Sequence, residues 1–502
     1  MKTPLYIAGE FYGIQKYVLG ISAAGAGQAK RLRARSFHVQ VLGEVVVRRI
    51  SEAFAKAAST SMMEGGGQFV LEVESSPAAK ETLASLRTTL QSELLLELQG
   101  QLGLNIAWAD TLAEALRLRS RERRRSWSHV MAGPSGWVTS QMSRPSIAPP
   151  CEICGKLSAT RQWQDGDLVE AVCTRCDEDR RTGALIPWIH SISLATNTKT
   201  GPIILGRRVR LDRQETYGAK PVYRRVPLDS EEKLLTFEQI ADTAPGVPLL
   251  GVLKADVDDL GGRIASQMVD AAGSQDLSEL SRSVDRFFSL SLQNKLRRDS
   301  RPIFTVFSGG DDLFLVGAWN DMLAVAIETH DAFWAGPGAQ YNLTISAGVA
   351  FTPPGIPVRN AASRAERLLP EAKKGPKNQC ATLDGVWQWD EIARICRAGR
   401  ILAHHVNDEV APRALLHRFF RILSGSEEMA PSQWAYHLTR HFRARRARTR
   451  EQSEFQDWCE AVDELWIRPK EPRAARDLQM ARATLLYALV ATRSRRESHE
   501  WD

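Results

Sequence analysis

The sequence predicts an α+β protein with two ferredoxin-like βαββαβ units, a cysteine-rich region between them and a helical C-terminal part. Three observations support this fold class. Apolar runs of strand length flank a Gly-Gly-Asp-Asp turn, helical and strand patterns follow one another around that turn in βαββαβ order, and a related but acid-free pattern opens the chain. The chain therefore reads as a diverged internal repeat with insertions.

The turn Ser308-Gly309-Gly310-Asp311-Asp312 lies between the apolar runs 303–307 and 313–317. Its glycines permit the positive φ of a tight hairpin and allow a phosphate to approach the backbone closely. Two carboxylates about 4 Å apart repel each other by roughly 4 kcal/mol at an effective dielectric constant near 20. A divalent cation would offset this repulsion, so the hairpin tip predicts a metal site. A solvated turn is the alternative for this cluster by itself.

A second acidic cluster follows the apolar run 249–253 and lies within the segment from Asp256 to Gly262. Alternation along a strand places Asp256 and Asp258 on one face, and Gly261 and Gly262 could open backbone N–H groups to a phosphate. A solvated turn is again the alternative for this cluster alone. Together, the two clusters at the ends of neighbouring strands predict a two-metal phosphoryl-transfer site.

The remaining elements of this unit are expected over 277–296 (helix), 303–317 (hairpin), 320–334 (helix), 343–350 (strand) and 358–374 (helix). The last helix runs into a basic cluster that contains Lys373, Lys374 and Lys377. These lysines could bind a triphosphate. Cations also stabilise helix C-termini, so a structural role is the alternative.

The first unit begins with a strand at 5–9 and has the glycine-rich segment Gly65-Gly66-Gly67-Gln68 at the position of the acidic hairpin. This hairpin carries no carboxylate, and Glu10 is the acid near the first strand. One half of the repeat therefore keeps metal-binding acids and the other does not.

Two Cys-x-x-Cys pairs, Cys151 with Cys154 and Cys173 with Cys176, lie between the units. Four thiolates at this spacing close a tetrahedral shell and predict a structural zinc ribbon at 151–176. Disulfides are the alternative, but the first 19 residues lack a signal-peptide pattern and we expect a reducing cytoplasm. The other cysteines are expected to be buried thiols: Cys380, Cys396 and Cys459.

The 502-residue chain has a net charge of +7, and its arginines and lysines gather at 30–35, 117–125 and 443–450. Such clusters suit phosphate backbones, although a solvated helix face is the alternative for 443–450. C-terminal helices are predicted over 390–406, 411–423, 432–448, 451–465 and 472–492. The expected domains are 1–111, 112–245, 246–385 and 386–502.

The segments 251–261, 308–312 and 346–350, with 362–374, resemble the second palm of the large subunit of type III CRISPR effector complexes. The N-terminal segments 13–17 and 29–37 are similar to the "GIQ" and "RLRGRS" signatures of the same family. The resemblance implies two palm domains, a helical C-terminal domain that packs along small subunits, and partners that include Cas backbone subunits, CRISPR RNA and target RNA.

By this resemblance the chain is expected to convert ATP into cyclic oligoadenylates, with the degenerate first palm binding the second nucleotide. Asp256 and Asp311, with Asp312 assisting, would hold two Mg²⁺ or Mn²⁺ ions. The expected nucleotide contacts are Ser308, Gly309, Gly310, Gly261, Gly262, Lys373 and Lys377. Ser308 is expected near the adenine, or as a cap of its own turn. A diguanylate-cyclase-like enzyme and a nucleotide-binding assembly scaffold without turnover are the rival functions.

Many members of this family begin with a histidine-aspartate nuclease domain, whereas here the first palm pattern starts within the first dozen residues. We therefore expect no such domain and no DNase activity from this chain alone. His330-Asp331 lies in a predicted palm helix, the adjacent His404 and His405 diverge by about 100° around a helix, and the pair His437 and His441 lies among arginines.

Overall fold

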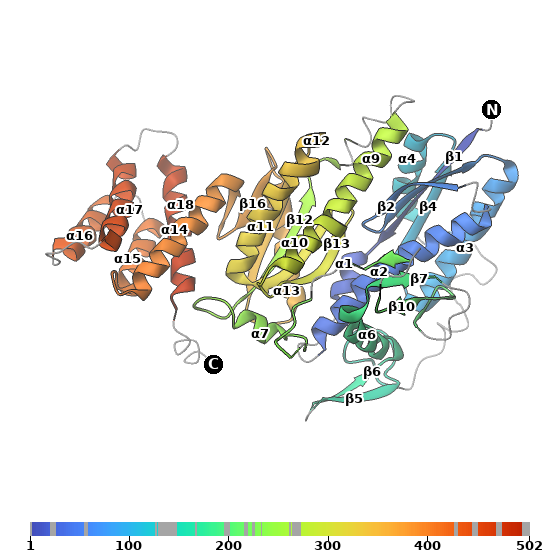
Figure 1. The fold of residues 1–502 in the computed structure, drawn as a ribbon, viewed down its shortest axis with the longest axis horizontal. Coiled ribbons are helices and arrows are strands. Elements are labelled where there is room, and N and C mark those ends of the chain that lie inside the picture. The colour runs from blue at the N-terminus through green and yellow to red at the C-terminus, as the bar shows by residue number, and fades with distance from the viewer. Residues whose placement is uncertain are drawn as a thin grey trace.

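The structure is a computed structural model of the 502-residue chain. It describes residues 3–20, 27–54, 59–125, 128, 148–165, 168–194, 201–214, 219–222, 226–231, 233–260, 263, 273–425, 430–443, 450–467 and 474–493. These residues form a mixed helix-and-strand protein, which confirms the predicted class. The first unit, the second unit and the C-terminal helices follow one another along the long axis (Figure 1). No helix in the described ranges is long and apolar enough to cross a membrane.

The first unit is a four-stranded antiparallel sheet of order β2-β3-β1-β4. Its elements are β1 (Pro4–Tyr12), α1 (Ile14–Leu19), α2 (Gln28–Ala53), β2 (Ser59–Gly65), β3 (Gln68–Glu74), α3 (Pro77–Leu98), β4 (Gly103–Ala109) and α4 (Leu112–Glu122). Leu112 and Ala115 of α4 pack on Ala8 and Val70 of the sheet. The helix thus covers this sheet, beyond the boundary expected at residue 111.

The second unit has the same strand order, β13-β14-β12-β15, and adds β16 and β17 beyond β15. Its elements are β12 (Leu250–Val257), α9 (Gly273–Arg286), the π-helical turn η4 (Phe287–Ser291), α10 (Leu292–Arg298), β13 (Phe304–Gly309), β14 (Asp312–Ala318), α11 (Trp319–Phe333), β15 (Ile345–Thr352), α13 (Val358–Ala372), β16 (Gln379–Thr382) and β17 (Gly385–Gln388). The predicted helices and strands of this unit are therefore found within a few residues of their expected bounds.

A shared irregularity supports the internal repeat. The register of the β2–β3 hairpin shifts between Ser61 and Met63, and that of the β13–β14 hairpin between Thr305 and Phe307. In each hairpin the extra residue stands three positions before the first glycine of the turn. A bulge bends a hairpin and increases its twist, so both turns are aimed in the same way from their sheets.

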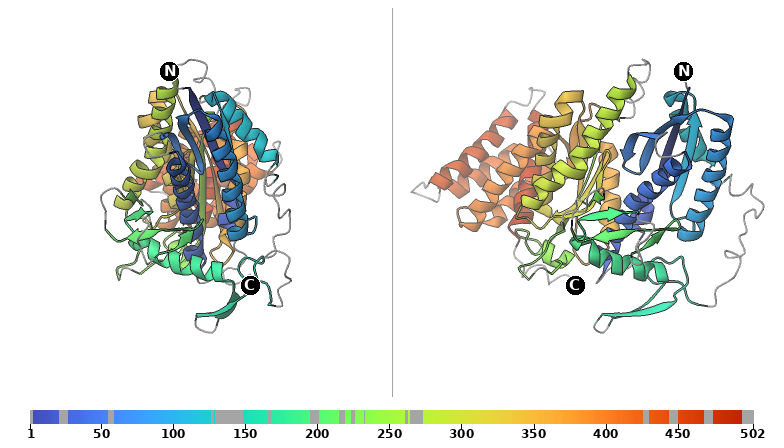
Figure 2. Two further views of the ribbon diagram at one scale, coloured as in Figure 1. Left: turned by 90° about the vertical axis from the view of Figure 1, so that its right-hand side faces the viewer. Right: turned by 45° about the vertical axis from the view of Figure 1, so that its right-hand side comes forward.

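The C-terminal helices share a hydrophobic core with one face of the second unit. They are α14 (Trp389–Asn407), α15 (Arg413–Ser424), α16 (Ala430–Arg443), α17 (Arg450–Ile467) and α18 (Ala474–Ala491). Trp319 of α11 packs edge-on against Tyr487 of α18, with ring centroids 4.8 Å apart. The two further views show this bundle at the end of the molecule opposite the first unit (Figure 2).

The region between the units contains the β5–β6 hairpin (Arg161–Asp165 and Leu168–Val172) and α6 (Thr174–Leu185), with the short elements η3 (Ile186–Trp188), β7 (Ser191–Ser193), β8 (Ile203–Ile204), β9 (Arg207–Arg208), β10 (Arg210–Asp212), β11 (Lys220–Pro221) and α7 (Phe237–Ala241). Helix α6 packs on α2 so closely that a Cβ on Gly183 would lie 1.8 Å from the carbonyl oxygen of Lys30.

This packing overturns one prediction about charge. Arg31, Arg33 and Arg35, expected to face a phosphate backbone, are each at most 2% exposed. Arg31 pairs with Glu170 at 2.9 Å, Arg35 pairs with Asp179 at 3.0 Å, and Arg33 Nε donates to the Gly183 carbonyl at 3.1 Å. These guanidinium groups bond within the protein and connect α2 to the cysteine-rich region, although Arg31 Nε has no hydrogen-bond partner. That basic cluster is therefore structural.

Candidate active site

Three carboxylates meet at one end of the second sheet. Asp256 lies near the end of β12, and Asp312, the first residue of β14, is directly opposite it in the antiparallel register. Asp311 precedes Asp312 in the turn, and its carbonyl oxygen accepts a hydrogen bond from Val257 N at 3.2 Å. The structure thus brings together the three acids that the sequence singled out, and it places them on two adjacent strands with a short turn.

Burial and mutual repulsion keep these carboxylates protonated to unusually high pH. Burial, and then the negative charge of Asp256, raise the pKa of Asp311 to about 6. Burial and the charges of Asp256 and Asp311 raise the pKa of Asp312 to about 8, while burial also raises the pKa of Asp256. Carboxylates that resist ionisation together form a site whose charged state needs a counter-ion. The donor set therefore fits a hard divalent cation that prefers oxygen ligands.

Lysines surround the acids. Lys373, directly after α13, forms an ion pair with Asp256, and its Nζ also lies 3.3 Å from the Val257 carbonyl oxygen. Lys377 pairs with Asp259. Both expected triphosphate ligands thus lie at the acidic site, although each holds a carboxylate here. Gly261 and Gly262, the other expected triphosphate contacts, lie outside the described residues.

Asp258 supports the site from within the protein. It is 4% exposed and accepts hydrogen bonds from Thr344 Oγ1 at 2.8 Å, Ser346 Oγ at 3.0 Å and Asn378 N at 3.1 Å. All three bonds end on Asp258 Oδ2, whereas the buried Oδ1 accepts no hydrogen bond and lies 3.8 Å from Lys373 Nζ. Asp258 therefore ties β15 and the segment after α13 to the end of β12.

The turn 308–312, which we call the metal hairpin after its proposed ion, is not an exposed tip, because the turn of the first unit covers it. A Cβ added to Gly310 would lie 2.7 Å from Gly66 Cα, and one added to Gly66 would lie 3.4 Å from Asp311 Oδ1. Both glycines have positive φ, +63° and +59°. Only residues without a side chain allow the two turns to touch at this distance.

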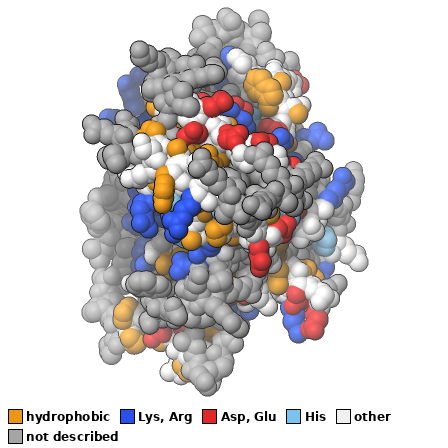
Figure 3. Space-filling view, turned by 90° about the vertical axis from the view of Figure 1, so that its left-hand side faces the viewer, with side chains coloured by type: hydrophobic (Ala, Val, Ile, Leu, Met, Phe, Trp, Pro, Cys, Tyr) orange, Lys and Arg blue, Asp and Glu red, His pale blue; other side chains and the backbone are white. Residues whose placement is uncertain are grey.

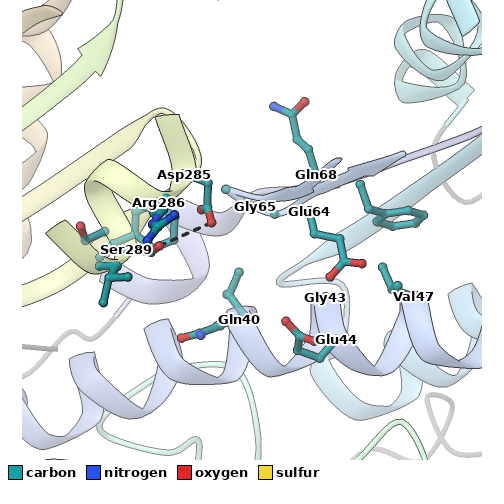
Figure 4. Close-up of a pocket in the computed structure, with 18 residues that line it drawn as sticks. Gln40, Gly43, Glu44, Val47, Glu64, Gly65, Gln68, Asp285, Arg286 and Ser289 are labelled. Atoms are coloured by element: carbon teal, nitrogen blue, oxygen red, sulfur yellow. Dashed lines mark hydrogen bonds between the residues drawn. The ribbon is translucent and has the colours of Figure 1, made fainter. Parts of the chain in front are cut away.

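Asp285 of α9 holds this contact in place. Its Oδ1 accepts a hydrogen bond from Gly310 N at 2.7 Å, and its Oδ2 accepts one from Ser289 Oγ at 3.5 Å (Figure 4). A Cβ on Gly65 would lie 2.8 Å from the same Asp285 Oδ1. Ser308 donates its hydroxyl to the Phe288 carbonyl at 2.6 Å and so anchors β13 to η4, while its place near an adenine stays a prediction.

Cavities open on both sides of the touching turns. One, of about 360 Å³, is lined by α2, the β2–β3 turn and the end of α9, and it carries three acids, Glu44, Glu64 and Asp285, and one base, Arg286 (Figure 4). The other, of about 460 Å³, is lined by Lys16, Arg123 and Lys254 together with Glu10 and Asp312. The first cavity is acidic, while the second offers cations beside the metal-binding acids.

The first unit has a counterpart of the acidic site, in which an arginine takes the place of the proposed metal ion. Glu10 pairs in register with Gln68, as Asp256 pairs with Asp312. Arg119 of α4 lies 3.5 Å from Glu10 Oε2 and donates from Nη1 to Gln68 Oε1 at 3.0 Å. The Arg119 guanidinium group thus neutralises the carboxylate that remains in this half of the repeat.

The four predicted cysteine ligands converge. Cys151, Cys154, Cys173 and Cys176 are buried, and their sulfur atoms lie within 4.8 Å of one another. Two sulfur ligands at about 2.3 Å from one tetrahedral zinc would be about 3.8 Å apart. The Cys154 and Cys173 sulfurs are 3.9 Å apart. The cluster can therefore hold a tetrahedral metal. Among the described residues, it is the one group in which three or more potential ligand atoms lie this close together.

Sequence reasoning missed several residues of the site. Lys254 is 6% exposed, and burial lowers its pKa against the opposing charges of Glu366, Asp312 and Asp256. When the Gln15 amide is oriented to satisfy both of its neighbours, its oxygen accepts from Lys254 Nζ at 2.8 Å and its nitrogen donates to Glu366. The "GIQ" segment of the first unit thus contacts the second unit. The position of Gln15 in the sequence gives no sign of this contact. Lys254 itself, two residues before Asp256 on an alternating strand, could have been found.

Comparisons with known proteins agree with this architecture. The family described as Cas10/Cmr2, second palm domain, matches residues 249–381, and the family described as Csm1 subunit domain B matches residues 4–135. The strand order and the acidic hairpin thus define a palm-domain protein. The chain belongs to the Cas10/Csm1 family of type III CRISPR large subunits.

Curated relatives and solved structures extend the likeness over nearly the whole chain. The single-strand-specific deoxyribonucleases Cas10/Csm1 (subtype III-A) of Enterococcus italicus and Mycobacterium tuberculosis are 24% and 23% identical to it over 87% and 97% of this chain. The chain spans 62% and 66% of their lengths. A Csm1–Csm4 subcomplex of the type III-A interference complex has a TM-score of 0.70 at 20% identity, covering 98% of this chain and 70% of that one.

Proposed function

We propose that this chain is the large subunit of a type III-A CRISPR complex and that it converts ATP into cyclic oligoadenylates when target RNA binds. The observation that carries the proposal is the cluster of Asp256, Asp311 and Asp312 at the contact between two palm units, with a cavity on each side. Similar structures at TM-scores of 0.66 to 0.70 are described as Csm1–Csm4 cassettes with one ATP, with pppApA, with cA3 and with cA4. Those ligands belong to those proteins and support the proposal for this one.

The charges of the two cavities suggest how ATP would lie. A triphosphate would be repelled by the side that carries Glu44, Glu64 and Asp285, and attracted to the side of Lys16, Arg123 and Lys254. Lys373 and Lys377 could leave their carboxylate partners for phosphate oxygens, since each is a flexible point charge. The two carboxylate-lined strand ends would then lie beside the α-phosphate.

In the proposed step the 3′-oxygen of one ATP bonds to the α-phosphorus of another, and the bond between that phosphorus and the pyrophosphate oxygen breaks. Mg²⁺ or Mn²⁺ bound by Asp256, Asp311 and Asp312 would supply the Lewis acid for this transfer. The carboxylates would fix the reacting groups in line, and the hydroxyl proton would pass to water. No protein nucleophile is needed, because positioning and charge stabilisation supply the catalysis.

The cysteine cluster is proposed to hold structural Zn²⁺, and a Csm4-like subunit, CRISPR RNA and target RNA are the proposed partners. Two rival functions remain distinguishable. A diguanylate-cyclase-like enzyme would use GTP, and a nucleotide-binding scaffold would bind ATP without turnover. The hairpin of the first palm has no carboxylate, and the nearby Glu10 pairs with Arg119. This difference between the palms favours an arrangement in which one chain supplies two unequal nucleotide sites.

The test is mass spectrometry of the products formed from ATP or GTP and Mg²⁺ by the assembled complex, with and without matching target RNA. Wild-type complex is expected to give cyclic oligoadenylates only with target RNA. Asp311→Ala combined with Asp312→Ala is expected to lower synthesis by at least about 10³-fold, since the variant loses the metal ligands. Unchanged assembly is checked by size-exclusion chromatography. Comparable ATP conversion by the double variant would show that the site is elsewhere.

A further inference from the structure

A basic cavity of about 780 Å³ lies among the C-terminal helices, outside both palm units. The end of α14, the start of α15, the middle of α16 and the residue after α18 line it. Its charged and titratable lining residues are Glu409, Arg413, Arg418, His437, Arg440 and His441. Figure 3 shows lysine and arginine side chains gathered on the end of the molecule that this bundle forms.

Three arginines and one carboxylate, that of Glu409, line the cavity, so positive charge is in excess here. Arg418 comes from α15 and Arg440 from the neighbouring α16, and both guanidinium charges act on His437 between them. Burial, then these two charges, lower the pKa of His437, so the imidazole is neutral at physiological pH. Neither Arg418 nor Arg440 forms an ion pair with a carboxylate of any described residue. Like charges held together favour an anion between them.

Arg413 differs from these two arginines because the fold already uses it. Its Nη2 donates to the Leu489 carbonyl at 3.4 Å, in the last turn of α18. A cation at a helix C-terminus is stabilised by the carbonyls there. The charges left for a ligand are therefore those of Arg418 and Arg440.

An exposed aromatic ring stands beside this charge. Tyr436 is 58% exposed, its hydroxyl accepts a hydrogen bond from Arg440 Nη1 at 3.4 Å, and its ring centroid is 5.1 Å from that of His437. Tyr436 is not among the residues that line the cavity, but its bond to Arg440 places its ring next to one that is. An aromatic face next to guanidinium groups is the arrangement on which nucleotide bases stack while their phosphates are neutralised.

We propose that this cavity is a second nucleotide-binding site, in which Arg418 and Arg440 bind a phosphate and Tyr436 stacks on the base. The site is separate from the one between the palms and goes beyond the proposed nucleotide synthesis. Phosphate and base are shared by a free nucleotide and a single-stranded polynucleotide. An acidic peptide would satisfy the arginines but gain little from Tyr436. A metal bound by His437 and His441 would be repelled by the arginines.

The site can be tested with the full chain in a buffer without added Mg²⁺ or Mn²⁺, which leaves the palm site without metal and the cysteine cluster undisturbed. Binding of a labelled single-stranded RNA of about 10 nucleotides is measured by fluorescence anisotropy over a range of salt concentrations. ATP, inorganic phosphate and oligoglutamate serve as competitors. Hydrogen exchange reports whether α15 and α16 become protected when the RNA binds.

Arg418→Gln with Arg440→Gln is expected to weaken binding at least tenfold and to reduce the salt slope by about 1.4, because each phosphate neutralised on a single strand adds about 0.7 to that slope. Tyr436→Ala is expected to weaken it about fivefold or more, and Tyr436→Phe to retain it. The matched control is Arg394→Gln, since Arg394 is exposed on α14 and pairs with Asp390 at 3.3 Å. Thermal unfolding of each variant checks the fold.

Competition distinguishes the sources. Displacement by ATP as well as by RNA identifies a free nucleotide, and displacement by RNA alone identifies a polynucleotide strand; either result supports the site. Displacement by oligoglutamate with equal potency, or wild-type binding by Tyr436→Ala, overturns the nucleotide assignment. Binding by the double arginine variant with the wild-type affinity and salt slope, or no change in hydrogen exchange in α15 and α16, refutes the site itself.

Discussion

At the scale of single residues, the central feature is a pair of adjacent carboxyl groups, Asp311 and Asp312, whose pKa values are raised by burial and by neighbouring negative charge. Asp311 and Asp312 have pKa values of about 6 and about 8, so one or both are protonated in the metal-free protein at neutral pH. Metal binding must release these protons. The affinity for the metal is therefore linked to pH.

We predict that the affinity of the full chain for Mn²⁺ rises at least tenfold between pH 6 and pH 8.5. Over this range a growing fraction of Asp312 is already ionised, so metal binding has fewer protons to displace. Isothermal titration calorimetry in buffers of different ionisation enthalpy measures both affinity and proton release. The linkage has the opposite sign for the metal-free protein. Its pKa values are raised on folding, so its stability falls as pH rises from about 4 to about 8. Asp312→Asn should weaken both effects, and an affinity independent of pH in the wild type would contradict the assignment.

A second residue-scale prediction concerns the touching turns. Gly65→Ala would place a methyl group 2.8 Å from Asp285 Oδ1 and 3.3 Å from Gly310 Cα, so it should displace the metal hairpin and lower nucleotide synthesis about tenfold or more. Gly43→Ala is the matched control. Gly43 lines the same cavity from α2, and a Cβ there meets nothing within 4 Å.

In this pair of variants, rates are read with saturating ATP and Mg²⁺, together with Mn²⁺ affinity and thermal unfolding. Gly43→Ala should be as active and at least as stable as the wild type, because alanine favours a helix. Equal rates for Gly65→Ala and Gly43→Ala would show that the first palm does not position the hairpin.

At the scale of elements, the structure couples the cysteine cluster to α2, the long helix that follows β1 and α1 in the first palm. Arg35 of α2 pairs with Asp179 of α6, and its Nη2 lies 3.5 Å from the Cys176 sulfur. Arg175 of α6 is also close to Asp179, at 3.3 Å. Buried charges of this kind are stable only while each partner stays in place. The cysteine cluster, α6 and the start of α2 are therefore expected to lose their structure together.

We predict one Zn²⁺ per chain, and we predict that Cys173→Ser removes it and costs more than about 3 kcal/mol of stability, as expected for a structural zinc site. Elemental analysis and chemical unfolding measure these quantities. Cys459→Ser is a suitable control for zinc content, since Cys459 is a buried thiol outside the cluster. Faster hydrogen exchange in α2 of the zinc-free protein would confirm the coupling, while folded wild-type protein without zinc would exclude this role.

At the scale of the whole molecule, the relatives are named deoxyribonucleases, and this chain spans less than two thirds of the lengths of those two. Within the described ranges the histidines have other roles. His330 lies 3.0 Å from Asp331 and stacks on Trp389, while His405 is buried. In the described part of the chain, none of these histidines belongs to a compact group of three or more potential metal ligands.

We therefore predict that the purified chain leaves single-stranded DNA intact in the presence of Mn²⁺, Ni²⁺ or Mg²⁺. Gel analysis of labelled DNA is the measurement, with a known single-strand nuclease as positive control. Cleavage that is lost in a variant with His437→Ala and His441→Ala would reveal a nuclease centre in the C-terminal bundle and would also argue against its proposed nucleotide site.

The sequence by itself determined the features that depend on neighbouring residues. The alternation of strands, the glycine turn and the adjacent acids placed Asp256, Asp311 and Asp312 at one sheet end, and the paired Cys-x-x-Cys spacing brought four thiols together. These patterns are local, so chain geometry alone constrains them. The order of the βαββαβ units and of the C-terminal helices could be read for the same reason.

Only the tertiary structure decided what covers the metal hairpin and where the charges go. The contact of Gly65 and Gly66 with Asp285 and the metal hairpin joins segments more than 200 residues apart. Arg31 and Arg35 of α2 are buried against carboxylates more than 130 residues away. A sequence shows the charge of an arginine but not its distant partner. Burial is a property of the assembled surfaces, and it converted the expected phosphate-binding cluster into the joint between the first palm and the cysteine-rich region.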